Sequence, residues 1–307
     1  MPLFRLSLFL FLLTGYVATA QQFMPLWPAG KMPNSKGMVL TDSIANERIY
    51  RVGTPGMYTF FPSMQENKGA AVIICPGGGY ERLAYIISGQ QLAKWFNTMG
   101  ISAFVLNYRL PNSPDLKQRE LGPLQDAQRA MRLIRANATR WGIKPDKVGI
   151  LGTSAGGHLA ALLAAATSDV STIGDSTSRF GFRPDFAILI SPVITMGHYA
   201  HAGSRKNLLG PTPTPEMLKT YSLENAVTAT TPPCFLVHAF NDTGVDQRNS
   251  LLFYQALVDR KIPSSLHIFP QGAHAIALRN NPGSTQQWVT LCESWMHEMN
   301  ILTESNR

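Results

Sequence analysis

Short apolar runs recur along the chain and are separated by longer stretches with the spacing of amphipathic helices. The runs lie at residues 71–75, 103–108, 148–151, 186–190, 235–239 and 265–269. Runs of this length that are nearly continuously apolar are typical of strands buried on both faces. The pattern therefore predicts a mostly parallel central sheet with helices on both faces, which is the α/β class.

The segments between these runs predict the helices. We expect them over residues 90–99, 123–141, 246–261 and 284–299, and an alanine-rich one from His158 to Ala166. Residues 48–52 and 57–61, which flank a Gly-Thr-Pro-Gly stretch, predict a β-hairpin.

One segment breaks the alternation. Residues 195–233 are rich in Pro, Gly, Thr and Ser, and we interpret them as an insertion over the carboxyl ends of the strands. Ligands bind at that edge in sheets of this kind. No internal repeat or shift in composition divides the rest, so we expect residues 21–307 to form a single domain.

The first 20 residues have the organisation of a signal peptide. Arg5 precedes an apolar stretch from Leu6 to Leu13, and Ala18-Thr19-Ala20 has the small residues of a cleavage site. We expect the mature chain to begin at Gln21 and to be exported, to the periplasm or outside the cell. The apolar stretch is too short to span a bilayer and no later one reaches 18 residues, so we expect no stable membrane insertion.

Composition and charge describe an ordinary globular protein. The chain has 307 residues, of which 45% are apolar and 15% charged, with a formal net charge of +8. Arg129, Arg132, Arg135 and Arg140 recur at helical spacing, and we interpret them as a solvated helix face. Because no nucleic-acid motif accompanies them, we expect no nucleic-acid partner.

Neither metal nor cofactor is expected. The three cysteines, Cys75, Cys234 and Cys292, lack the spacing of a metal site and read as buried core residues, with a Cys75–Cys234 disulfide as the alternative. His198 and His201 have no third ligand nearby, so they do not predict a zinc site.

Gly152-Thr153-Ser154-Ala155-Gly156 lies between a predicted strand and a predicted helix. This is the context of a nucleophile elbow, a sharp turn that presents a serine hydroxyl while small neighbours let strand and helix approach closely. A serine hydroxyl is a weak nucleophile at neutral pH and needs a histidine base oriented by a carboxylate. The elbow therefore predicts an acyl-transferring hydrolase with Ser154 as its nucleophile.

The acid and the histidine of such enzymes follow the serine in that order. Asp242 and His274 each lie just past a predicted strand, and we expect them to complete the catalytic triad with Ser154. Asp246 is the alternative acid, although its position favours a helix start. We expect His158 to pack beneath the site, and His238 and His267 to be structural or partly exposed.

An oxyanion hole needs backbone N–H groups beside the serine. The residue after the nucleophile, Ala155, is expected to donate one. Three glycines follow the strand at 71–75, and of these we expect Gly78 and Gly79 to donate the rest. A phosphate-binding role for this loop is disfavoured because no Gly-Lys-Ser/Thr follows it.

At several motifs the chain resembles the bacterial acetylxylan-esterase-like α/β-hydrolases, which are exported carbohydrate esterases. The motifs are residues 76–80, 107–110, 126–130, 152–158 and 201–210. The resemblance implies an α/β-hydrolase fold and removal of acetyl groups from plant-type polysaccharides, with Ser154, Asp242 and His274 as the triad. Tyr80, His201 and Arg205 lie within these motifs and are the candidate substrate-binding residues.

Our leading hypothesis is an exported serine esterase that removes short acyl groups, acetyl above all, from a carbohydrate such as acetylated xylan. The polar insertion at 195–233 lacks the apolar face of a lipase lid. A feruloyl or aryl esterase and a prolyl-type peptidase remain alternatives, because the same triad serves them. A catalytically idle hydrolase fold used for binding is the alternative outside the enzymes.

Overall fold

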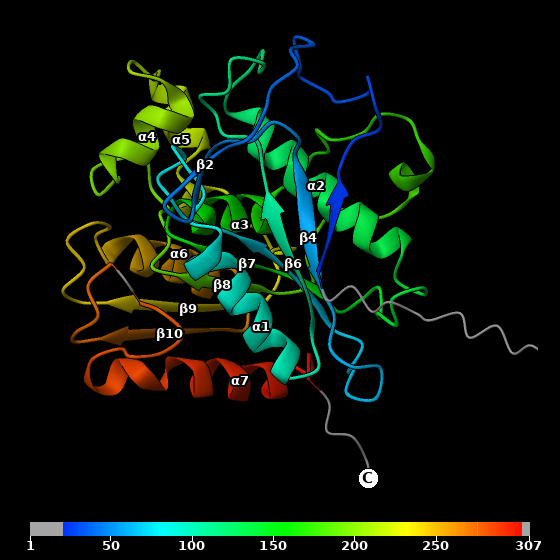
Figure 1. Cartoon of the computed structure of the whole chain (residues 1–307). Coiled ribbons are helices and arrows are strands. Elements are labelled where there is room, and N and C mark those ends of the chain that lie inside the picture. Colours follow the sequence, from blue (N-terminus) through cyan, green and yellow to red (C-terminus); the bar gives the residue numbers. More distant parts are fainter. Residues whose placement is uncertain (1–20, 275, 303–307) are drawn as a thin grey trace, which may run out of the picture.

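The computed structural model describes residues 21–274 and 276–302, and an eight-stranded sheet forms its centre (Figure 1). The predicted signal peptide lies outside the described residues. The strand order is β1-β4-β6-β5-β7-β8-β9-β10. The strands are β1 (Gln22–Pro25), β4 (Gly56–Phe60), β5 (Ala71–Cys75), β6 (Ser102–Asn107), β7 (Val148–Thr153), β8 (Ala187–Ile190), β9 (Cys234–Ala239) and β10 (Ser264–Phe269).

The sheet is parallel from β6 to β10, and only β1 and β4 run antiparallel to their neighbours. Helices cover both faces, as the apolar runs predict. The helices are α1 (Gln91–Thr98), α2 (Leu121–Ala136), α3 (Ala155–Ala165), α4 (Ala202–Leu209), α5 (Pro215–Thr220), α6 (Arg248–Asp259) and α7 (Trp288–Glu298). Apolar side chains of α1 and α7 pack on one face of the sheet and those of α2, α3 and α6 on the other.

The expected helices and strands appear with small shifts at their ends, except for the predicted hairpin, which is wrong. Residues 48–51 form β3, which pairs with β2 (Ser43–Ala45) in a separate two-stranded sheet. Asn46 and Glu47 both have positive φ, as a two-residue hairpin turn requires. β4 instead joins the central sheet, where its side chains are largely buried and its backbone pairs with β1 on one edge and β6 on the other.

The predicted solvated arginine face is wrong at Arg129 and Arg132, whereas Arg140 is exposed as expected. Arg129 and Arg132 are buried and form ion pairs with Asp175 and Asp169. These aspartates lie in the long loop between α3 and β8, which covers this side of α2. Helical spacing could not reveal the loop, because a residue far along the chain supplies each carboxylate.

The motifs at 107–110 and 126–130, which carry the resemblance, connect β6 with α2 and with the glycine loop. Arg109, just past β6, makes a buried ion pair of 2.9 Å with Asp126 of α2. Next to it, the Tyr108 hydroxyl donates a hydrogen bond of 2.8 Å to the carbonyl oxygen of Pro76. Since Pro76 begins the glycine loop, these contacts fix the loop against the sheet.

The segment 195–233 contains two helices, α4 and α5, which were not predicted. Thr214 caps α5 by accepting a hydrogen bond from Met217 N–H, and proline follows at the first helical position. Within the described residues, no helix has the length and apolar character needed to cross a membrane.

Candidate active site

Ser154 lies at a sharp turn between β7 and α3, with φ +56° and ψ −121°. A non-glycine residue in this region of backbone space is strained, by about 1–3 kcal/mol. The turn has no room for side chains on either side. A Cβ atom on Gly152 would lie 2.0 Å from the oxygen of Gly156, and one on Gly156 would lie 2.1 Å from the oxygen of Cys75. The two glycines are therefore what allows the predicted elbow to form.

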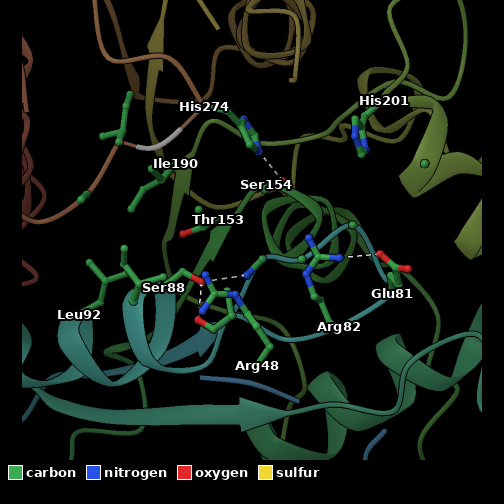
Figure 2. A pocket seen from close by; sticks show the side chains of 18 of the residues that line it. Arg48, Glu81, Arg82, Ser88, Leu92, Thr153, Ser154, Ile190, His201 and His274 are labelled. Carbon is green, nitrogen blue, oxygen red and sulfur yellow. Dashed lines mark hydrogen bonds and ion pairs between the residues drawn. The ribbon is translucent and has the colours of Figure 1, made fainter. Parts of the chain in front are cut away.

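A chain of hydrogen bonds leads away from the serine. His274 Nε2 lies 2.8 Å from Ser154 Oγ, and its Nδ1 lies 2.8 Å from Asp242 Oδ2 (Figure 2 shows the first of these). Asp242 follows β9 and His274 follows β10, so loops at the carboxyl edge of the sheet bring together residues up to 120 positions apart. In this arrangement the histidine can accept the serine proton.

The carboxylate of Asp242 is held by four donors. Oδ1 accepts hydrogen bonds of 2.8 Å from the N–H groups of Gly244 and Val245. Oδ2 faces His274 and also the Nε2 of His238, at 3.2 Å. Burial by itself would raise the pKa of Asp242, but these hydrogen bonds outweigh it and hold the pKa well below its usual range.

The role of His238 beside the acid was not predicted. It lies in β9 and is fully buried; its Nδ1 lies 2.8 Å from Ser250 Oγ. Because Nε2 faces two acceptors, Asp242 and the carbonyl oxygen of Val245, it carries the proton. Its place in the middle of a strand is the only sequence signal, and it does not reveal which loop folds over it.

Asp246 does not reach the histidine. Its carboxylate accepts hydrogen bonds from the backbone and side chain of Arg248 at the start of α6, as a helix-start residue would. The arrangement favours Asp242 as the acid.

The glycine loop presents free donors to the same space. The N–H of Gly77 donates to Ser88 Oγ at 3.1 Å, which removes it from the set. Across residues 21–274 and 276–302, no acceptor is found for the N–H groups of Gly78, Gly79 and Ala155. These are the three groups predicted to form the oxyanion hole.

A cavity of about 520 Å³ opens over Ser154. Figure 2 shows its two different sides, with Leu92 and Ile190 on one and Glu81, Arg82 and His201 on the other. The lining also includes the apolar side chains of Ile87, Ile276 and Leu278 and the polar side chains of Arg48 and Asn207. The nucleophile therefore lies where an apolar surface meets a polar one.

Residues 57–257 match the model of the BD-FAE family. The chain belongs to this family. Together with the similar proteins described below, this match shows that the chain is an acetylxylan-esterase-like α/β-hydrolase. The predicted fold and the predicted family resemblance are thereby confirmed.

Two relatives align with most of this BD-FAE chain. It is 37% identical over 230 residues to endo-1,4-beta-xylanase B of Butyrivibrio fibrisolvens, covering 73% of this chain and 36% of the relative. It is also 37% identical over 227 residues to an acetylxylan esterase of Xylanibacter ruminicola, covering 72% of this chain and 44% of the relative. The chain thus spans less than half the length of these two proteins.

Solved structures of similar proteins cover nearly the whole chain. An acetyl ester-xyloside bifunctional hydrolase from Caldicellulosiruptor lactoaceticus is 36% identical, with a TM-score of 0.77 over 92% of this chain and 97% of that chain. Esterase 2 of Thermogutta terrifontis has a TM-score of 0.71 at 20% identity, over 94% of this chain and 96% of that chain. The latter likeness shows the fold alone.

Of the three candidate substrate-binding residues, only His201 lines the cavity of the BD-FAE chain within its described residues. His201 lines the cavity, as expected. Its Nδ1 accepts from the N–H of Ser204 at 3.1 Å and so caps α4, which leaves the proton on Nε2. Burial lowers the pKa of His201, and the nearby His274 lowers it further.

Tyr80 and Arg205, the other two candidates, are not among the residues that line the cavity. Tyr80 is fully buried, and its hydroxyl lies 2.9 Å from His158 Nδ1 beneath the elbow. Arg205 donates to the carbonyl oxygens of Met196 and Gly197 and is not part of the cavity wall. Both residues lie in motifs that carry the family resemblance, but their side chains hold loops in place.

All three cysteines are buried free thiols, as expected, so the alternative Cys75–Cys234 disulfide is not formed. Among the described residues, no cluster of three or more His, Cys, Asp or Glu side chains could hold a metal ion.

We expect His158 to make the free energy of unfolding of this protein depend on pH. It is fully buried under the elbow helix, and burial lowers its pKa to about 4. In the unfolded chain the pKa is near 6.5, so between about pH 6.5 and 4 only the unfolded chain takes up the proton. Stability therefore falls as pH falls through this range, by about 2 kcal/mol at pH 5 from this group.

Urea denaturation at pH 7 and pH 5 measures this effect. We expect His158→Gln to lose less stability than the wild type between the two pH values. His297→Gln, at an exposed position in α7, is the control and should behave as the wild type. An equal loss in His158→Gln and the wild type would contradict the assignment.

Proposed function

We propose that the chain hydrolyses acetyl and other short acyl esters of a plant-type polysaccharide such as xylan. The observation that carries the proposal is the hydrogen-bonded chain of Ser154, His274 and Asp242 opening into a cavity with free backbone N–H groups. The acetylxylan esterase among the relatives supports the substrate class. We also propose that the protein is exported, on the strength of the signal-peptide pattern in residues 1–20.

In the first half of the reaction, Ser154 Oγ attacks the ester carbonyl carbon while its proton passes to His274 Nε2. The carbonyl oxygen becomes negatively charged and accepts hydrogen bonds from the N–H groups of Gly78, Gly79 and Ala155. Asp242 keeps the other ring nitrogen of His274 protonated and stabilises the imidazolium. When the intermediate collapses, the bond to the sugar oxygen breaks and His274 returns the proton to that oxygen.

In the second half, a water molecule takes the place of the sugar. His274 removes its proton as the oxygen attacks the acyl carbon of the acyl-enzyme. Collapse of this intermediate breaks the bond to Ser154 Oγ, which recovers its proton from His274. The products are the carboxylic acid and the free serine.

The insertion at 195–233 favours a short acyl group on a polar alcohol. It contributes His201, Gly203 and Asn207 to the cavity wall. The large apolar side chains that are exposed elsewhere on the described surface do not occur in this segment. A lipase lid needs such a face to meet a lipid surface.

We therefore expect 4-nitrophenyl acetate to be hydrolysed with at least a ten-fold higher kcat/KM than the octanoate. We also expect release of acetate from acetylated xylan. An equal or higher kcat/KM on the octanoate, with a jump in rate above its critical micelle concentration, would replace the proposal with a lipase. Cleavage of a prolyl peptide without any ester hydrolysis would replace it with a peptidase.

A second candidate, hydrolysis of aryl esters such as feruloyl esters, is favoured by a neighbouring cavity. This cavity shares Ile87, Ala277 and Leu278 with the first and is lined further on by Trp95. An aromatic acyl group could extend along the shared apolar wall and contact the indole ring. A higher kcat/KM on 4-nitrophenyl ferulate than on the acetate would select this candidate.

A further inference from the structure

We propose that Arg48 and Arg82 form a binding site for a carboxylate on the carbohydrate, so that the preferred substrate is an acylated glycan carrying a uronic acid. This inference rests on the proposed esterase function and names the substrate class more narrowly. Both arginines line the cavity over Ser154 (Figure 2).

A backbone bridge holds the two arginines on one surface. Ile49 of β3 and Leu83 of the glycine loop exchange two hydrogen bonds, of 3.0 and 2.8 Å. The side chains of this bridged pair are both buried. Because neighbouring side chains in extended chains point to opposite faces, Arg48 and Arg82 both point to the other face, where they occupy diagonal positions. That face is the wall of the cavity.

The positive charge of Arg48 is not neutralised within the described residues. The Nη1 group of Arg48 donates hydrogen bonds to the carbonyl oxygens of Asn46 and Glu47, at 3.3 and 3.2 Å. Among the described residues, no carboxylate pairs with this guanidinium. These two bonds fix the orientation of the group within its hairpin turn. Its remaining N–H groups can serve a ligand.

Arg82 is paired only weakly. Its Nη1 lies 2.6 Å from Glu81 Oε2, and the side chain of Arg82 is 40% exposed and that of Glu81 56%. Exposed ion pairs of this kind contribute little to stability, so a substrate can compete for the guanidinium. The wall thus offers two guanidinium groups against one exposed carboxylate.

Guanidinium groups bind carboxylates through two parallel charge-assisted hydrogen bonds. The carboxylate belongs on the sugar and not on the acyl group, because the side of the cavity away from Arg82 presents the apolar side chains of Leu92 and Ile190 (Figure 2). A glycan that carries a uronic acid near the acylated sugar has the required chemistry.

The test compares two acetylated xylo-oligosaccharides of equal length, one neutral and one carrying a single glucuronic acid. The readout is the ratio of kcat/KM for the acidic substrate to that for the neutral one. We expect a ratio of about 10 or more for the wild type, the value of one charge-assisted hydrogen bond. The ratio should fall as salt is raised, since part of the site is exposed.

Four variants locate the effect. Arg48→Gln and Arg82→Gln should each bring the ratio close to 1. Arg51→Gln, in the same hairpin but outside the cavity wall, should keep the wild-type ratio. Glu81→Gln should raise the ratio, because it removes the competing carboxylate, and a folding defect would not produce a gain. Circular dichroism checks that each variant is folded.

A wild-type ratio of 1 in low salt would overturn the inference, as would a loss in Arg51→Gln equal to that in Arg48→Gln. Activity on the neutral substrate tests the proposed function separately. If neither oligosaccharide is deacetylated, the proposed function fails. If both are deacetylated at the same kcat/KM, only the carboxylate site fails.

Discussion

Replacing Ser154 with alanine is expected to lower kcat for ester hydrolysis by about 10⁴-fold or more, with the fold unchanged. Without Oγ no acyl-enzyme forms, and the remaining rate comes only from the oxyanion hole and from substrate binding. The side chain makes one hydrogen bond, to His274, so its loss removes little that holds the structure. The measurement is the steady-state rate on 4-nitrophenyl acetate with purified protein.

Ser191→Ala is the matched control. Ser191 follows β8, the neighbouring strand, and also has a positive φ, of 43°, but it does not line the cavity. We expect it to keep wild-type activity. If Ser154→Ala retained a tenth of the wild-type rate, the nucleophile would have to be another group.

Asp242→Asn is expected to lower kcat by about 10³–10⁴-fold, and the hydrogen bonds around the carboxylate explain why. The N–H groups of Gly244 and Val245 require an acceptor at the Oδ1 position, so the amide oxygen takes that place. The amide nitrogen then faces His274 Nδ1 and donates to it. The histidine proton moves to Nε2, which can no longer accept the proton of Ser154.

Asp246→Asn is the control for this prediction. Asp246 pairs with Arg248 at the start of α6, on a partly exposed part of the surface. We expect its kcat to stay within a few-fold of the wild type. The opposite ranking of the two variants, measured on one substrate, would move the acid to Asp246.

Much of the fold could be predicted because its signals are local. The apolar runs of the strands from β5 to β9 reflect burial on both faces, and the glycines around Ser154 reflect the close approach of β7 and α3. Gly78, Gly79 and Ala155 could be named for the same reason, since the glycine loop and the elbow are each continuous in sequence. The family resemblance added the motif at 201–210, and His201 does lie in the cavity.

The errors have a common physical cause, which is that partners distant in sequence decide the outcome. Arg129 and Arg132 looked like a solvated face because their carboxylates lie about 40 residues away. β4 looked like half of a hairpin, but it pairs with β1 and β6 in the central sheet. Tyr80 looked like a ligand-binding residue of the glycine loop, and His158 draws it under the elbow.

By itself, the sequence determined the α/β class, the elbow at Ser154 and the order in which an acid and a histidine must follow it. Those features are set by side-chain size, apolar periodicity and chain order, which a single sequence displays. Only the tertiary structure decided that His238 supports Asp242, that Gly77 is already bonded to Ser88, and that Arg48 joins Arg82 on the cavity wall. Each of these depends on the relative placement of separate loops, because hydrogen bonds and ion pairs act over only a few ångströms of space, whatever the separation along the chain.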